Sequence, residues 1–257
     1  MDVDLLYTIF GGLLGAVLGS FLNVCILRWP AEESVVRPPS RCPKCGYGLH
    51  WYDNVPIVSW LVLRGKCRQC RTSISIQYPL IELATALIWA AFTWYRGPSL
   101  ALVQGAVFFT ILLGIAMTDA REYIIPDEFS LGGLVIGIAL SLPGGFPVIG
   151  ESLLGAAVGF GLLWLVAVAG KKVFKEDAMG GGDIKMMAMV GAFTGWTGVL
   201  LTIFLGSVLG VLIFVPPALF GKKKLVPFGV FLALGAAATY LFSSAILDWY
   251  RNVAFGG

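Results

Sequence analysis

Long apolar runs separated by short polar connections dominate the chain. Eight of these runs are continuously apolar and do not alternate with polar residues, a pattern that predicts helices. They cover residues 5–27, 78–96, 99–118, 129–147, 149–170, 184–196, 198–219 and 226–248. The one long polar connection, residues 28–77, lies between the first and second runs.

Composition places these helices in a membrane. Hydrophobic residues make up 58% of the 257 positions and charged residues only 13%, against about 25% charged in soluble domains. In lipid a backbone must satisfy its own hydrogen bonds, so such runs form helices. We expect an all-α polytopic membrane protein of eight transmembrane helices, divided into a first helix (1–27), a loop domain (28–77) and a seven-helix domain (78–257).

The positive charges indicate the orientation. Of the 18 Lys and Arg residues, all but Arg96 and Arg251 lie in or beside four alternate connections, including residues 28–77 and Lys222–Lys224. The positive-inside rule makes these connections cytoplasmic and leaves both termini outside. The sixth run reaches only about 20 Å, yet omitting it would move Lys222–Lys224 outside, so we retain it.

Two further classes are not indicated. The net charge is only +3 and the Lys and Arg residues form no stripe, so nothing indicates a nucleic-acid partner. The first run has no basic segment before it and no small-residue cleavage site after it. We therefore expect a retained helix and not a signal peptide.

Small residues recur at four-residue spacing in three of the runs. This spacing lets two helix backbones approach closely, so it predicts faces for helix packing. The residues are Gly11, Gly15 and Gly19 in the first run, Gly155 and Gly159 in the fifth, and Gly206 and Gly210 in the seventh.

Two carboxylates stand at the ends of apolar runs. Asp183 follows Gly180–Gly182 at the start of the sixth run, and Asp119 ends the third. Intramembrane acids are functional candidates, and the orientation puts both at the cytoplasmic edge. Two adjacent carboxyls share a proton, so one can activate water while the other protonates a carbonyl oxygen, as in aspartic peptide hydrolysis. The alternative is that Asp119 is a solvated loop residue and Asp183 a helix cap.

Four cysteines of the polar connection form two Cys-x-x-Cys pairs, at Cys42 and Cys45 and at Cys67 and Cys70. Two pairs at this separation predict a four-thiolate zinc site, which leaves no open ligand position and is therefore structural. Disulfides are the alternative, but a cytoplasmic loop lies in a reducing compartment. With few aliphatic residues, the loop depends on the metal for its stability.

Together these features resemble the type IV prepilin peptidase family, the bifunctional leader peptidase/N-methyltransferases of bacterial pilus and type II secretion systems. The resemblance covers nearly the whole chain. Besides the cysteines, it is carried by Gly19-Ser20-Phe21-Leu22-Asn23-Val24, Arg28, Tyr78-Pro79-Leu80-Ile81-Glu82, Asp119, Ile125-Pro126-Asp127, Gly180-x-Gly182-Asp183 and Pro227-Phe228-Gly229. One departure is Val230, where the family often has Pro, and we expect it to affect only a helix start.

The resemblance implies the function. Asp119 and Asp183 would be the catalytic pair of an intramembrane aspartyl peptidase in the bacterial inner membrane, working at its cytoplasmic face. The substrate would be a type IV prepilin or pseudopilin precursor, cut after Gly and before a residue that is usually Phe. Gly180 and Gly182 would lie against the extended leader. The new N-terminus would then be methylated with S-adenosylmethionine as donor.

Two other functions remain open from the residues alone. One is an intramembrane aspartyl protease of broader range that does not methylate; the other is a carrier or channel that uses the acids as an ion path. No Gly-x-Gly-x-x-Gly motif marks a nucleotide cradle. Asn23 is a candidate for the methyl transfer by resemblance only, and it can equally be an interhelical hydrogen-bond partner.

Overall fold

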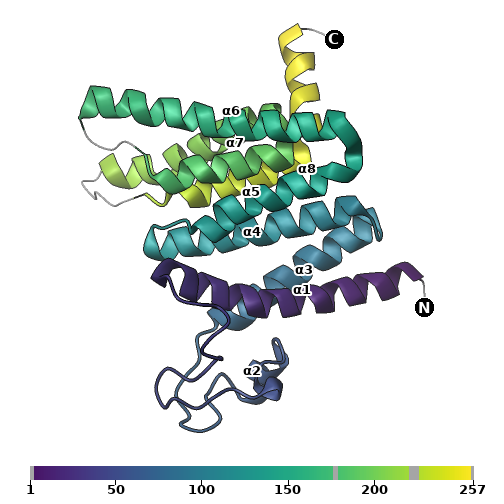
Figure 1. Cartoon of the computed structure of the whole chain (residues 1–257), viewed down its shortest axis with the longest axis vertical. Coiled ribbons are helices and arrows are strands. Elements are labelled where there is room, and N and C mark those ends of the chain that lie inside the picture. Colours follow the sequence, from purple (N-terminus) through teal and green to yellow (C-terminus); the bar gives the residue numbers. More distant parts are fainter. Residues whose placement is uncertain (1–2, 176–178, 220–225, 256–257) are drawn as a thin grey trace. The chain divides into compact units, whose positions relative to one another are not determined.

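The computed structural model describes residues 3–175, 179–219 and 226–255. Lys222–Lys224, which contributed to the predicted orientation, lie outside this part. The described residues contain no β-strand, which confirms the all-α prediction. The helices (Figure 1) are α1 (Val3–Arg28), α2 (Val58–Val62), α3 (Gln77–Arg96), α4 (Leu100–Glu122), α5 (Asp127–Ser141), α6 (Gly145–Phe174), α7 (Gly181–Leu219) and α8 (Phe228–Phe255), with 3-10 turns at Trp29–Ala31, Trp51–Asp53 and Leu142–Gly144.

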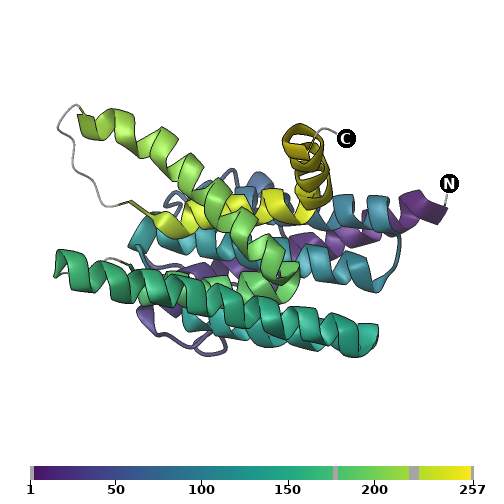
Figure 2. The same cartoon turned by 90° about the horizontal axis from the view of Figure 1, so that it is seen from above.

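The predicted sixth and seventh runs are the two arms of α7. Gly195 has φ 70° and ψ 178°, which interrupts the helix beside the break predicted near residue 197. Figure 2 shows the second arm turning away from the line of the first. Glycine reaches this left-handed φ without a Cβ clash, so the kink is encoded locally.

The prediction of eight crossings is not confirmed by helix length and composition. Within the described ranges, five stretches are long and apolar enough to cross a membrane, which supports a multi-pass membrane protein. The number is smaller because α5 and α6 count as one stretch of 47 residues and the arms of α7 as one of 33. In addition, α3 is not among the five, and it carries Gln77, Glu82 and Arg96.

Residues 1–110 form the first of two compact units. Within it α1 packs along α3. A Cβ atom on Gly15 would lie 2.6 Å from the carbonyl oxygen of Thr85, so the two helices approach as closely as predicted from the glycine spacing. Trp89, Leu102 and Ala106 form a buried cluster between α3 and the start of α4.

Residues 111–257 form the second unit. Its central helix is α7, which packs against α5, α6 and α8. A Cβ atom on Gly155 of α6 would collide with the carbonyl oxygen of Gly191, and one on Gly191 with that of Gly155. The two backbones are therefore in contact, which confirms the predicted packing face. A Cβ atom on Gly206 would likewise meet the carbonyl oxygen of Phe231 in α8 at 3.0 Å.

The polar connection of residues 28–77 contains little regular structure. Every residue of this loop is described. Between α1 and α3 its only helices are α2 and the 3-10 turns at Trp29–Ala31 and Trp51–Asp53. Cys42 and Cys67 are its buried hydrophobic residues. A loop with so little apolar burial lacks a core of its own, as the composition predicted.

Candidate active site and cysteine cluster

Asp119 lies in the last turn of α4 and is 6% exposed. The backbone N–H of Val230, in the first turn of α8, donates a hydrogen bond of 3.0 Å to Asp119 Oδ2. Asp119 is therefore not a solvated loop residue. Val230, which we expected to affect only a helix start, contacts this carboxylate through an N–H group that proline lacks.

Asp183 is the third residue of α7. Its carboxylate lies near the Gly180 backbone: a Cβ atom on Gly180 would be 3.2 Å from Asp183 Oδ2. Its other oxygen, Oδ1, is buried and has no hydrogen-bond partner among the described residues. Asp183 therefore keeps one carboxylate oxygen that no described residue satisfies.

The segments that carry the two carboxylates converge on one residue, Ile125. Ile125, 8% exposed, lies between their helices: a Cβ atom on Gly182 would be 2.9 Å from Ile125 Cβ, and one on Gly229 would be 2.8 Å from Ile125 Cδ1. The end of α4 and the starts of α7 and α8 therefore converge around Ile125, with Asp119 buried and Asp183 partly buried.

The glycines before Asp183 differ in their surroundings. Gly180 and Gly181 are exposed, whereas the space that a side chain on Gly182 would need is filled by Ile125. We expected the substrate leader to lie against Gly182, but Ile125 of this chain packs there.

An ion pair that sequence reasoning missed lies beside the acids. Lys185 Nζ donates to Asp127 Oδ1 at 2.7 Å and to Asp127 Oδ2 at 2.8 Å, which joins the start of α5 to the start of α7. Both side chains are partly exposed, at 37% and 55%. Asp127 is thus an exposed partner of Lys185 and, unlike Asp119, is not buried.

The four predicted cysteines come together. Their sulfur atoms lie within 4.8 Å of one another, with Cys42 Sγ 3.8 Å from Cys70 Sγ and Cys45 Sγ 4.0 Å from Cys67 Sγ. A tetrahedral ion with metal–sulfur bonds of about 2.3 Å requires sulfur separations of about 3.8 Å. The donor set and its spacing therefore fit one metal ion.

Both Cys-x-x-Cys pairs lie in turns of the same form. In each turn the N–H of the first cysteine donates to the carbonyl oxygen five residues later, Tyr47 or Thr72. The residue four positions after that cysteine is left-handed in both turns, Gly46 with φ 72° and Arg71 with φ 59°. The sequence indicated this conformation only at the glycine.

The thiols of the first pair differ in acidity. Hydrogen bonds from the backbones of Cys45 and Lys44 lower the pKa of Cys42 to about 6. A hydrogen bond from the Tyr47 backbone lowers the pKa of Cys45, but burial and the neighbouring thiols outweigh it and raise that pKa to about 11. At neutral pH Cys42 is thus a thiolate, which is the form that binds metal.

A buried carboxylate that was not predicted from the sequence joins the two cysteine turns. Asp53 accepts from Arg68 Nε at 2.7 Å and from the Tyr47 hydroxyl at 3.3 Å, so it links the two turns. Burial raises the pKa of Asp53, but the hydrogen bonds from Arg68 and from the His50 backbone hold it below its ordinary value.

Comparison with known proteins agrees with the resemblance. Residues 13–96 match the bacterial peptidase A24 N-terminal domain, and residues 106–215 match the type IV leader peptidase family. The chain is similar to proteins named prepilin leader peptidase/N-methyltransferase. That of Aeromonas hydrophila is 32% identical over 93% of this chain and 91% of its own length. That of Pseudomonas aeruginosa is 35% identical over 94% and 92%.

A third relative of the same name, from Myxococcus xanthus, is 41% identical over 81% of this chain, and the match spans 62% of that protein. No solved structure matches the chain.

Proposed function

The chain belongs to the type IV leader peptidase family, and we propose that it removes the leader from type IV prepilins or pseudopilins and then methylates the new N-terminus. The observation that supports the peptidase most directly is that Asp119 and Asp183 lie on segments that converge on Ile125, with Asp119 buried and one oxygen of Asp183 buried. Two acids on converging segments, one of them with a buried oxygen that has no partner among the described residues, are equipped for acid–base chemistry on water and an amide.

In the proposed mechanism one carboxyl of the pair is ionised and the other is protonated. The ionised one takes a proton from water as the water oxygen attacks the carbonyl carbon of the scissile bond. The protonated one donates to the carbonyl oxygen, which develops negative charge. Collapse of the tetrahedral intermediate then breaks the C–N bond, and the amine leaves with a proton from the pair.

We propose that the substrate leader lies along Gly180–Gly182. Gly180 and Gly181 are exposed, so their backbone is open to an extended chain. Gly182 contributes indirectly, because the absence of its side chain lets Ile125 pack there and hold α7 next to Asp119.

For the membrane arrangement we propose eight crossings, with the cysteine loop and the acids at the cytoplasmic face. The two arms of α7 and the α5–α6 hairpin each supply two of the eight. A prepilin changes from a charged leader to an apolar helix at the cut, and that junction would lie at the membrane surface where Asp119 and Asp183 stand.

We propose that Cys42, Cys45, Cys67 and Cys70 hold one zinc ion. All four ligands come from the protein, so the ion would stabilise the loop and take no part in bond breaking.

The peptidase is tested with Asp119→Asn and Asp183→Asn in the full-length protein in detergent, using a prepilin-like peptide and mass spectrometry of the products. Each variant should leave the leader uncleaved. Glu122→Gln is the matched control, because Glu122 is an exposed acid only three residues after Asp119. Complete leader removal by either Asn variant would refute the pair.

The same spectra test methylation. In the presence of S-adenosylmethionine the mature peptide should gain one methyl group on its N-terminal amine. A mature peptide that stays unmethylated at saturating donor would favour the protease without methyltransferase activity.

A further inference from the structure

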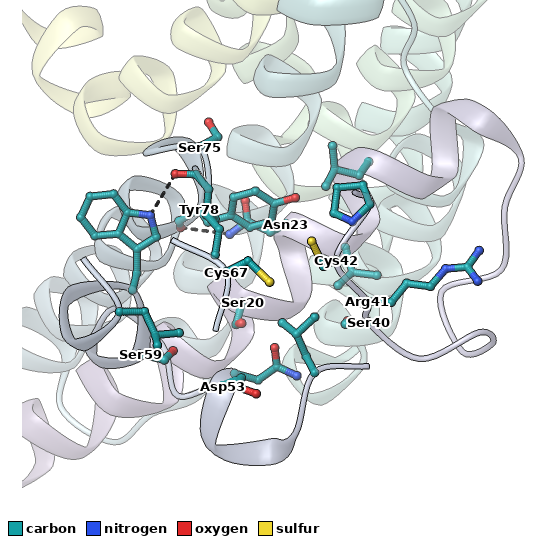
Figure 3. Close-up of a pocket in the computed structure, with 18 of the residues that line it drawn as sticks. Ser20, Asn23, Ser40, Arg41, Cys42, Asp53, Ser59, Cys67, Ser75 and Tyr78 are labelled. Atoms are coloured by element: carbon teal, nitrogen blue, oxygen red, sulfur yellow. Dashed lines mark hydrogen bonds between the residues drawn. The ribbon is translucent and has the colours of Figure 1, made fainter. Parts of the chain in front are cut away.

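A cavity of about 800 Å³ lies in the first unit, between α1, the start of α3 and the cysteine loop (Figure 3). Its volume falls in the range of about 300–1,000 Å³ that small-molecule sites occupy. The peptidase site uses none of the residues that line it. Those that the following argument uses are Ser20, Asn23, Trp60, Tyr78 and Glu82.

Asn23 offers this cavity a hydrogen-bond acceptor. It is 1% exposed, and its Nδ2 donates to the carbonyl oxygen of Gly19 at 3.2 Å. The same Nδ2 donates to the carbonyl oxygen of Tyr78 at 3.1 Å (Figure 3). These two acceptors fix the amide, because rotating it would place its oxygen against both carbonyls. Asn23 Oδ1 is buried and has no partner among the described residues. Buried polar atoms are nearly always satisfied, so this oxygen points to a ligand that donates.

Glu82 offers a negative charge. It is 7% exposed, and its Oε2 accepts from the backbone N–H of Ile57 at 2.7 Å. No Lys or Arg within the described ranges forms an ion pair with it. A buried carboxylate without a cationic partner is costly, and a positively charged ligand would relieve that cost.

Aromatic surface is available beside these groups. Trp60 and Tyr78 both line the cavity, and the Trp60 ring is fixed by a hydrogen bond of 3.3 Å from its Nε1 to the carbonyl oxygen of Ile74. A fixed ring suits stacking against a planar base. The cavity thus combines an acceptor, a negative charge and aromatic faces.

We propose that this cavity is the binding site for the methyl donor S-adenosylmethionine, with Asn23 Oδ1 accepting from one of its donor groups and Glu82 opposing its positive charge. The assignment rests on the proposed methyltransferase function and gives it a place in the fold. S-adenosylmethionine carries amine and hydroxyl donors, a cationic sulfonium, an ammonium group and an adenine ring, which match the three features of the cavity. When bound, it supplies a methyl group: its sulfur keeps the electron pair of the broken C–S bond, while the substrate amine forms the new C–N bond with its lone pair and releases a proton to solvent.

The first test measures equilibrium binding of S-adenosylmethionine and of its product S-adenosylhomocysteine to the full-length protein in detergent. Glu82→Gln and Asn23→Ala should each weaken binding by about tenfold or more, the loss expected for a hydrogen bond or charge contact in a buried site. Glu32→Gln is the control, because Glu32 is an exposed acid of the same loop that does not line the cavity. Donor binding by both cavity variants at wild-type affinity would overturn the assignment.

A second measurement keeps the test decisive if these variants do not fold. In a Ser20→Cys variant, the thiol at position 20 should react with a water-soluble reagent, and S-adenosylhomocysteine should slow that reaction, as read by peptide mapping. Unchanged labelling at a concentration that saturates binding would overturn the site.

The two proposals fail in different ways. A wild-type protein that neither cleaves nor methylates removes the proposed function. A protein that methylates and binds donor, yet shows no effect of Glu82→Gln and no protection at position 20, removes only the site.

Discussion

Replacing Gly229 by alanine tests whether Asp119 works in the position where the structure holds it. Gly229 is the second residue of α8. A Cβ atom there would lie 2.9 Å from Asp119 Oδ2, 3.1 Å from Asp119 Cγ and 2.8 Å from Ile125 Cδ1. Ordinary contacts of a Cβ atom begin at 3.4 Å, so the carboxylate or α8 must shift by about half an ångström.

The size of the effect follows from this shift. A misplacement of about 1 Å at a reacting group costs roughly 100-fold in rate, so half of that predicts a loss of about tenfold in kcat/KM for leader cleavage. Stability should not fall for lack of helix propensity, because alanine is favoured over glycine in a helix by about 1 kcal/mol. A loss of activity in Gly229→Ala would therefore report on geometry.

The assay compares cleavage of a prepilin-like peptide by Gly229→Ala and by Gly132→Ala. Gly132 lies in α5, and a Cβ atom there would meet nothing within 4 Å, so this control should cleave at close to the wild-type rate. A double variant with Ile125→Val separates the two contacts, because it removes Ile125 Cδ1 and leaves the clash with Asp119. If Ile125→Val restores the rate, or if Gly229→Ala cleaves normally, the clash with Asp119 is not the cause and the reasoning is refuted.

The other predictions concern the cysteine loop and the exposed ion pair. Positions 46 and 71 both have a left-handed φ, which costs a non-glycine residue about 1–2 kcal/mol. During chelation, Arg71→Gly should therefore make the loop more resistant to proteolysis, and Gly46→Arg should make it less resistant. Removing metal with a chelator should expose residues 28–77 to limited proteolysis, and a loop still protected when fully metal-free would contradict its dependence on the metal. Zinc affinity, measured by chelator competition, should fall as pH falls. The fall should be steeper below about pH 6, because Cys42 is protonated there and zinc must also displace its proton. If the slope of affinity against pH does not change across pH 6, Cys42 does not have this low pKa. Asp127→Asn should change the free energy of unfolding by less than about 1 kcal/mol and leave cleavage intact, since its pair with Lys185 is exposed.

The sequence predicted those parts of the fold that depend on local pattern. Apolar runs gave the long helices to within a few residues at most ends, because lipid leaves the backbone no alternative to a helix. The kink at Gly195 was anticipated as a break between two runs, and the glycine faces of α1, α6 and α7 were predicted from spacing alone. The cysteine cluster followed from the two cysteine pairs, since each pair makes a turn defined by its own few residues.

What the sequence did not reveal depends on contacts between distant segments. The N–H of Val230 donates a hydrogen bond to Asp119, 111 positions away in the sequence, and no local pattern near either residue predicts this contact. In the sequence Ile125 is an ordinary apolar residue, and only the structure shows that it packs against Gly182 and Gly229. Asp53 and Arg68 each look like solvated charges of a polar loop, and their role appears only when the two cysteine turns come together. The alternatives for Asp119 were open for the same reason, because spacing carries no measure of burial.

The contact between the backbones of α6 and α7 has a consequence for turnover. Gly155 and Gly191 meet main chain to main chain only a little more than two helical turns beyond Asp183, with no side chain between them that can change rotamer. The first arm of α7, which carries Asp183, is therefore held in place, because sliding it along α6 would make the two backbones clash. Admitting an apolar substrate helix and releasing the cut leader require a conformational change. We expect that change at the end of α4 and the start of α8, around Asp119.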